Sequence, residues 1–245
     1  MFKWSYYDKI ALPIVLAFII CISILLHFLL KNKSEKIKQI PLHIISVTLI
    51  ILEITKQIYF IATNTYTAKV LPIHFCSLIV VIIALTQFLP KKISKWLDVP
   101  SIIFPLAVMV LILIHPYAMI GNSSQTMFIS FTRFHAFYFH ALIMLYPILK
   151  LSLIKFNLKL KYSLSIIGCL VFYSTYAIPL AFKLNNNYLN ILHSDFYPLE
   201  QFRLTYGQVA YDIVIYVLGI SVCVGVYLIW YLIYKLKEKR RLKHA

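Results

Sequence analysis

Three chemically active residues lie together at the start of one strongly apolar stretch of the chain. Residues 71–77 read Leu-Pro-Ile-His-Phe-Cys-Ser, so His74, Cys76 and Ser77 stand near the beginning of the stretch 70–89. Such groups are costly inside a lipid bilayer unless a partner satisfies them or a function uses them. A cysteine thiol becomes a nucleophile when a nearby histidine or cation favours its thiolate form. Cys76 is therefore the first candidate for chemistry, provided that another part of the chain brings it such a partner.

A second apolar stretch, residues 127–151, carries three further candidates, Arg133, His135 and His140. On a helix with 3.6 residues per turn, Arg133 and His140 share a face, whereas His135 points elsewhere. Within its own stretch, His74 is turned away from Cys76, so we do not expect those two residues to pair. A pairing between Cys76 and His140, which lie on different helices, is geometrically allowed.

Opposite charges also occur inside an apolar stretch, at Glu53 and Lys56. The two residues are three positions apart, which on a helix puts them on one face and predicts an ion pair. Such a pair either braces two helices or supports a binding site, and the sequence leaves both interpretations open. Ionisable residues in membrane helices usually face the bundle interior or a wet cavity. We therefore group Glu53 and Lys56 with His74, Arg133 and His135 as candidates for substrate binding or site support.

The composition indicates what kind of protein must position these residues. The chain has 245 residues, of which 61% are hydrophobic and only 13% charged, and its mean hydropathy is +0.83. A soluble domain carries roughly 25% charged residues. We therefore predict an all-α polytopic membrane protein with a single transmembrane domain, residues 1–245. The net charge of +16 does not indicate a nucleic-acid partner, because the positive residues lie in short loops beside apolar stretches, where they set topology.

Seven apolar stretches are long enough to form a bundle of seven transmembrane helices. They lie at about residues 10–30, 41–63, 70–89, 99–120, 127–151, 162–184 and 209–234. Pro72 suits the first turn of the third helix. We expect Gly121–Gln125 to form a turn and the loop 185–208 to lie along the membrane interface.

Lysine-rich and lysine-poor segments alternate along the chain, which predicts the orientation of the helices. Most basic residues outside the helices fall in four segments, 31–38, 91–95, 150–161 and 235–245. The positive-inside rule puts these segments in the cytoplasm, Lys150 included, so we expect the N-terminus outside and the C-terminus cytoplasmic. The candidate residues then fall in the outer half of the bilayer or near its middle, whereas the inner half is apolar. The sequence therefore predicts a polar cavity open toward the outer leaflet.

The motif Leu-Pro-Ile-His-Phe-Cys, residues 71–76, resembles the Leu-Pro-x-His-x-Cys signature of the YwaF-like bacterial integral membrane proteins. His140, which Pro147 follows seven residues later, resembles a second family position, and so do Glu53 and Lys56. The same family includes the eukaryotic transmembrane protein 164, an acyltransferase acting on phospholipids. The resemblance extends over most of the chain, and these short motifs are its specific part.

The resemblance implies thiol-based acyl transfer, with Cys76 as the nucleophile and His140 as the general base. The cysteine attacks a lipid ester, and the acyl-enzyme passes its chain to a second lipid. A more distant resemblance to androgen-induced-gene-type lipid hydrolases points to the same chemistry. The pattern differs in one respect: the eukaryotic member has its cysteine directly after the proline, where this chain has Ile73. Cys76 therefore lies one turn, about 4.5 Å, further along the helix.

Two other functions remain open on the residues alone. One is a metal site, for which the chain has the ligand types that zinc uses. The candidate ligands are His74, His115, His135, His140, Glu53 and Asp212. No closely spaced histidine pair supports such a site. The other is a transporter or binding protein for a small solute or lipid, whose pathway Glu53, Lys56 and Arg133 would line.

No motif in the chain indicates a cofactor. The expected partners are membrane phospholipids, with anionic lipid headgroups at the cytoplasmic face. The other cysteines, Cys21, Cys169 and Cys223, are interpreted as small packing residues. Lysine far outnumbers arginine, and isoleucine and asparagine are frequent, a composition typical of AT-rich bacterial genomes. We therefore expect a multi-pass protein of the bacterial plasma membrane.

Overall fold

The computed structural model describes residues 5–116, 123–126, 128–156, 158–194 and 196–243, and these residues form helices and loops without a strand. Seven of their helical segments are long and apolar enough to cross a bilayer, which confirms the predicted all-α polytopic bundle. These segments are built from α1 (Tyr6–Leu30), α2 (Glu35–Ala62), α3 (Phe75–Phe88), α4 (Lys91–Leu97) with α5 (Pro100–Ile114), α8 (Phe131–Leu153), α9 (Ser163–Leu184) and α11 (Gln208–Lys243). The shorter elements are η1 (Ala68–Val70), α7 (Ser123–Thr126), η2 (Leu160–Tyr162), η3 (Tyr188–Asn190) and α10 (Tyr197–Tyr206).

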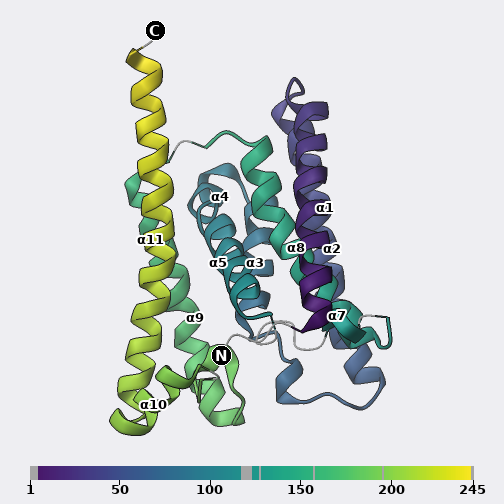
Figure 1. Cartoon of the computed structure of the whole chain (residues 1–245), viewed down its shortest axis with the longest axis vertical. Helices are drawn as coiled ribbons and strands as arrows, with labels where there is room; N and C mark the ends of the chain where they lie inside the picture. Colours follow the sequence, from purple (N-terminus) through teal and green to yellow (C-terminus); the bar gives the residue numbers. More distant parts are fainter. Residues whose placement is uncertain (1–4, 117–122, 127, 157, 195, 244–245) are drawn as a thin grey trace.

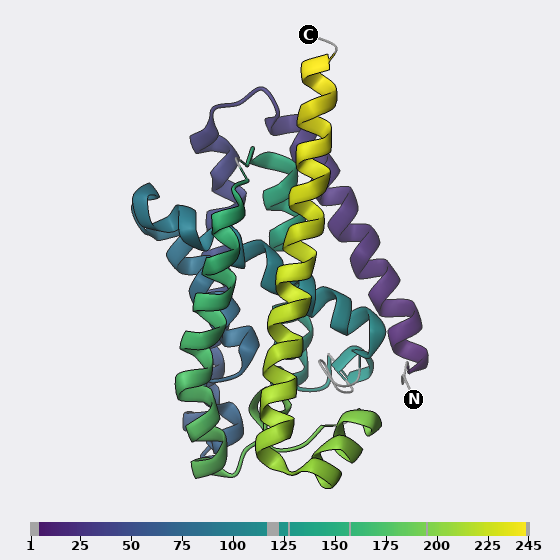
Figure 2. The same ribbon diagram turned by 90° about the vertical axis from the view of Figure 1, so that its left-hand side faces the viewer.

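Helix α8 occupies the middle of the bundle and packs against α1, α2, α3 and α5. Helices α9 and α11 pack against each other, and α11 also contacts α5. Figure 1 shows α1 and α2 on one side of the molecule, α9 and α11 on the other, and α3, α4, α5 and α8 between them. The start of α1 and the end of α11 lie at opposite ends of the long axis in Figures 1 and 2, as an odd number of crossings requires.

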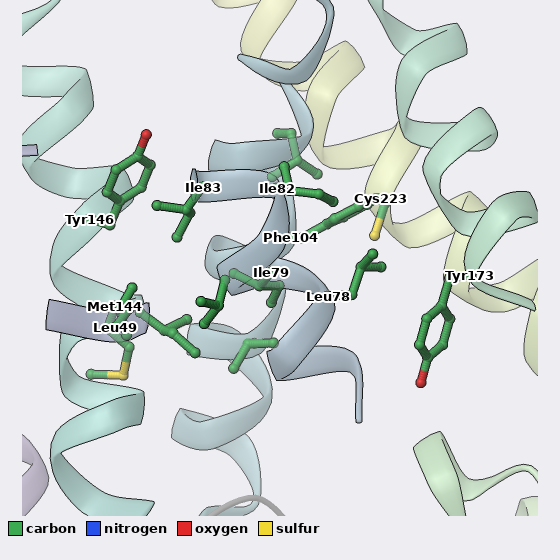
Figure 3. Packing of buried hydrophobic residues seen from close by; sticks show 14 of the residues in the cluster. Leu49, Leu78, Ile79, Ile82, Ile83, Phe104, Met144, Tyr146, Tyr173 and Cys223 are labelled. Carbon is green, nitrogen blue, oxygen red and sulfur yellow. The ribbon is translucent and has the colours of Figure 1, made fainter. Parts of the chain in front are cut away.

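Buried apolar side chains fill the space between the central helices. Ile79 and Ile83 of α3, Phe104 of α5, and Met144 and Tyr146 of α8 are almost completely buried. Figure 3 shows these side chains converging around α3. Interiors packed in this way transmit the position of one helix to its neighbours. The core therefore holds α3 and α8, the two helices that carry Cys76 and His140, in a fixed relation.

An ion pair with a buried lysine lies at the end of α8 that the positive-inside rule places toward the cytoplasm. Lys150 is in the last turn of α8, and its side chain is only 4% exposed. Its Nζ donates to Oδ1 of Asp98 at 2.7 Å and to Oγ of Ser101 at 2.9 Å, and it lies over the rings of Tyr146 and Phe156. These partners satisfy the ammonium, so Lys150 is part of the packed bundle.

The third membrane helix begins later than the sequence predicts. Helix α3 starts at Phe75 with His74 as its N-cap, so Pro72 lies in the turn before the helix rather than in its first turn. Helical hydrogen bonds begin at the carbonyl of His74, which accepts from the N–H groups of Ser77 and Leu78. Among the carbonyls before it, those of Ala68, Val70 and Ile73 accept from side chains of distant segments, namely Tyr188, Gln57 and Tyr173.

Other boundaries also differ from the predicted ones. Helix α5 ends at Ile114, and residues 117–122, which include part of the predicted fourth helix and of the turn Gly121–Gln125, lie outside the described residues. The remainder of that turn belongs to the short helix α7. The loop 185–208 contains η3 and α10, and α11 continues the last crossing into the basic segment.

Candidate functional site

Cys76 and His140 meet at the start of α3. Cys76 is the second residue of α3, and its Sγ lies 3.3 Å from Nε2 of His140 on α8. The other ring nitrogen of His140, Nδ1, lies 2.7 Å from the carbonyl oxygen of Ala136. A carbonyl oxygen only accepts hydrogen bonds, so Nδ1 carries the ring hydrogen and Nε2 presents its lone pair to the thiol. In this arrangement His140 can accept the proton of Cys76.

Two buried tyrosines hold the turn before α3, which positions Cys76 at the start of that helix. Tyr173 of α9 donates its hydroxyl hydrogen to the carbonyl of Ile73 at 2.9 Å, and Tyr188 of η3 donates to the carbonyl of Ala68. Tyr188 also packs edge-on against His74, with the ring centroids 5.1 Å apart. Buried carbonyls need a donor, and here tyrosines supply it in place of helical N–H groups. Distant segments therefore decide where α3 begins.

The Cys76–His140 pair lines a cavity of about 470 Å³, called here the Cys76 cavity. Its walls come from α2, α3, α5, α8 and the segment between α9 and α10. Of the residues predicted from the sequence, it gathers Cys76, His140, His74, Lys56 and His135. Nε2 of His74 lies 3.1 Å from the carbonyl of Lys69, which holds this ring at the edge of the turn before α3.

The predicted ion pair between Glu53 and Lys56 is confirmed. Lys56 Nζ lies 2.7 Å from Oε1 of Glu53, and both side chains are less than one-fifth exposed. Gln57 donates from Nε2 to the same Glu53 oxygen at 2.8 Å and to the carbonyl of Val70 at 3.0 Å. Glu53 lies behind Lys56 and does not line the cavity, whereas Lys56 does. The carboxylate therefore positions the lysine rather than facing a ligand.

His135 lines the same cavity as His140, although the helical phase predicts that it points elsewhere. The side chain of His135 is only 5% exposed, and its ring stacks on Phe139 with the centroids 5.0 Å apart. The two histidines lie on different faces of α8, as the helical phase predicts, and the cavity is wide enough to reach both, because it extends from Cys76 on α3 to Lys56 on α2. Helical phase gives a direction around the axis but not the width of the space beside it.

Three other candidates are not brought to this cavity. Arg133 is exposed in the first turn of α8, two turns or about 10.5 Å before His140 along the axis, so sharing a face with His140 does not bring it there. His115 caps the end of α5, and Asp212 of α11 accepts a hydrogen bond from Gln208 in a separate groove. In the described part of the chain, no group of three or more histidine, cysteine, aspartate or glutamate side chains converges as a metal site requires.

Ser77, which the sequence places beside Cys76, also lines the cavity, whereas two further polar lining residues carry no such signal. They are Asn187 and Asn190, from the segment that contains η3. The run of asparagines at 185–187, directly after a membrane helix, is the one feature of the sequence that marks this segment. Its approach to Cys76 depends on Tyr188, whose hydrogen bond to Ala68 ties η3 to the turn before α3.

Comparison with known families agrees with the resemblance of the motifs. The model of the TMEM164 family matches residues 1–234 of this chain. The match includes all the residues of the Cys76 cavity and every membrane-crossing segment except the end of α11. No curated protein and no solved structure matches the chain. The family assignment therefore stands on the match over nearly the whole chain.

Proposed function

This integral membrane protein belongs to the TMEM164 family, and we propose that it transfers acyl chains from lipid esters through a thioester on Cys76. The observation that carries the proposal is the 3.3 Å contact between Sγ of Cys76 and Nε2 of His140, with Nδ1 held by the carbonyl of Ala136. A thiol facing the lone pair of a fixed imidazole has the relation that nucleophilic catalysis needs.

In the first half of the proposed reaction, Nε2 of His140 takes the proton from Sγ of Cys76. The sulfur attacks the carbonyl carbon of the ester, a C–S bond forms, and the carbonyl oxygen takes up negative charge. When the carbonyl double bond forms again, the bond between this carbon and the alcohol oxygen breaks. The alcohol portion of the lipid leaves with the proton that His140 held, and the acyl chain stays on Cys76 as a thioester.

In the second half, an acceptor hydroxyl gives its proton to His140 and attacks the thioester carbonyl. The C–S bond breaks, and the sulfur recovers the proton from His140. A second lipid as acceptor makes the protein an acyltransferase, whereas water makes it a hydrolase. We favour a lipid acceptor, because Cys76 lies within a membrane-crossing segment, where lipids are the neighbouring molecules.

The surroundings of Cys76 support this chemistry in two ways. Cys76 lies in the first turn of α3, where backbone N–H groups lack partners within the helix and the helix dipole favours negative charge. Apolar side chains complete the cavity and suit an acyl chain. They are Phe75, Val108, Leu111 and Phe139. On the positive-inside rule we propose that the cavity opens in the outer half of a bacterial plasma membrane, with phospholipids as the acyl donors.

Labelling with a phospholipid that carries a radioactive acyl chain tests the proposal. The purified full-length protein should form a labelled adduct that hydroxylamine releases, as a thioester requires. His140→Gln should form the adduct more slowly, by about 10²- to 10⁴-fold, because the general base is lost. The adduct should disappear in Cys76→Ala and persist in Cys169→Ala, whose cysteine is half-buried on α9 outside the Cys76 cavity. An adduct that survives Cys76→Ala, or its absence from the wild type, would contradict the proposal.

A further inference from the structure

A second cavity of about 400 Å³ adjoins the Cys76 cavity and is called here the Lys69 cavity. The two cavities share Lys56, His135 and Ala136, which together form a common wall. The Lys69 cavity is otherwise lined by Phe60, Thr67, Lys69, Val70 and Thr132. Among the described lining residues of both cavities there are lysines and histidines but no aspartate or glutamate. A ligand that occupies both cavities therefore meets positive charge and hydroxyl groups beyond the Cys76–His140 pair.

The shared wall contains a buried polar atom without a partner. Nε2 of His135 is inaccessible and has no hydrogen-bond partner among the described residues, and the whole side chain is only 5% exposed. Leaving such a group unpaired costs about 1–3 kcal/mol. Buried polar atoms in folded proteins are almost always paired, so an unpaired nitrogen in a cavity wall is open to a partner that enters the cavity. With a hydrogen on Nε2, the ring would donate a hydrogen bond to an acceptor there.

The ammonium of Lys56 is a second group in this wall with hydrogens that no acceptor in the described part of the chain binds. Its Nζ has one acceptor among the described residues, Oε1 of Glu53 at 2.7 Å. An ammonium has three donors, so two remain for a ligand. The Glu53 carboxylate holds Nζ in place without lining either cavity. Thr67 and Thr132 add hydroxyl donors, and Lys69 adds a second ammonium on the far side.

We propose that this wall, formed by Lys56 and His135 with Lys69, Thr67 and Thr132 beyond it, binds the phosphate group of the lipid whose ester Cys76 attacks. The inference rests on the proposed acyl transfer for the position of the ester and adds a separate subsite for the phosphate. A compact ammonium suits a phosphate as a point charge, and histidine and threonine supply further donors to its oxygens. The ester then lies in the Cys76 cavity and the phosphate at the wall that opens into the Lys69 cavity.

Binding of lipids that Cys76 cannot cleave tests the subsite directly. The probes are a dialkyl-ether phosphatidic acid and the matching dialkyl-ether glycerol, which lacks the phosphate, and bound lipid is measured by native mass spectrometry of the full-length protein in detergent. Wild-type protein should bind the phosphate-bearing ether more tightly. Lys56→Gln and His135→Gln should each weaken that binding by about tenfold, as the loss of a charged hydrogen bond predicts, and leave the binding of the ether glycerol unchanged.

Matched variants separate loss of charge from loss of folding. Lys56→Arg keeps the cation and should retain most of the preference for phosphate. Lys183→Gln removes an exposed lysine at the end of α9, outside both cavities, and should change nothing. Unchanged binding of the ether glycerol shows that each variant is folded. Equal binding of both ethers by the wild type, or wild-type binding of the phosphatidic acid by both Lys56→Gln and His135→Gln, would overturn the subsite.

Inorganic phosphate distinguishes the two sources of this group. If millimolar phosphate displaces the phosphate-bearing ether from the wild type but not from Lys56→Gln, the wall binds free phosphate as well. If phosphate does not displace the ether, the wall is specific for the phosphate of a lipid headgroup. Both results support a phosphate subsite. The test of the subsite is also independent of the test of acyl transfer. Phosphate-dependent binding without a thioester on Cys76 would contradict the catalytic proposal and still support the phosphate subsite.

Discussion

The opposite ends of α8 lie beside two buried lysines that are paired in the same way but surrounded differently. Lys150 Nζ lies 2.7 Å from a carboxylate oxygen of Asp98, and Lys56 Nζ lies 2.7 Å from one of Glu53. Lys150 has a second acceptor in Ser101 and lies over two aromatic rings. Lys56 has no acceptor besides Glu53 within the described residues, and it lines two cavities.

The difference separates a lysine that holds the fold from one that is available to a ligand. Burying a charge is expensive, and only full hydrogen bonding offsets the cost. Lys150, which is 4% exposed, meets that condition within the protein. Lys56, which is 17% exposed, meets it in part, and the cavity side of its ammonium stays open. Although the two ion pairs have the same length, removing the lysine should therefore cost more stability at Lys150 than at Lys56.

The largest expected effect is the loss of stability in Lys150→Met. The substitution removes the charged donor of Asp98 and Ser101, and because Asp98 is 35% exposed and partly solvated, the cost should be about 2 kcal/mol. Lys56→Met should cost less, about 1 kcal/mol, because Gln57 still donates to Oε1 of Glu53. Denaturant unfolding of the two variants in the same detergent measures both costs.

A double variant provides the control for the Lys150 pair. In Lys150→Met/Asp98→Leu neither charge remains, so most of the lost stability should return, since apolar replacements of a whole buried pair are often close to neutral. Equal losses of stability in Lys150→Met and Lys56→Met would contradict the proposed difference between the two lysines. A double variant that is as unstable as Lys150→Met would contradict it as well.

An intermediate effect is expected from two tyrosines that lie at the same two ends. Tyr173 donates to the carbonyl of Ile73 at 2.9 Å, and Tyr227 of α11 donates to that of Lys159 at 2.7 Å. Either Tyr→Phe substitution removes one buried hydrogen bond and should cost about 1 kcal/mol. Tyr173→Phe should in addition change the alkylation rate of Cys76 several-fold, because it frees the turn before α3.

The alkylation rates are best measured with iodoacetamide in a background where the other three cysteines are replaced by alanine. Tyr227→Phe serves as the matched control, because it loses a hydrogen bond of the same kind far from Cys76. A Cys76 rate that responds equally to both substitutions would mean that the tyrosines act through general stability. A rate that responds to neither would mean that the turn before α3 is held by other contacts.

The sequence predicts the fold well where a single segment contains all the information. Seven apolar stretches of sufficient length and the Glu53–Lys56 pair are properties of one helix each. The start of α3 is not such a property, because Tyr173 and Tyr188 donate to carbonyls of the turn that precedes the helix, and the helix begins only after Pro72. The burial of Lys150 likewise depends on Asp98 and Ser101, which reach it from a different part of the chain.

The site shows the same division between local and distant information. The Cys76–His140 contact joins residues 64 positions apart, so the residue types suggest it but only the packing of α3 against α8 brings it about. Helical phase puts His135 on a different face of α8 from His140, but it does not show that the cavity is wide enough to reach both. Asn187 and Asn190 reach the site through the position of η3, which no pattern in their own segment predicts.

The smallest expected effect concerns a third ion pair, between Glu200 and Arg203 of α10, which is partly exposed and lies outside the bundle's two ends. Glu200 accepts hydrogen bonds from Arg203 at 3.1 Å and from the N–H of Ser194 at 2.9 Å. The Arg203 guanidinium, with the Ser194 N–H, lowers the pKa of Glu200 from 4.5 to about 2. A carboxylate with a lowered pKa contributes its full stabilisation above the unfolded value and loses it only as the pH falls toward the folded value. Corrected hydrogen-exchange protection of α10 should therefore stay constant from pH 7 to pH 5, and Glu200→Gln should lower it slightly across that range. A wild-type protection that declines steadily between pH 7 and pH 5 would show that another group holds this segment.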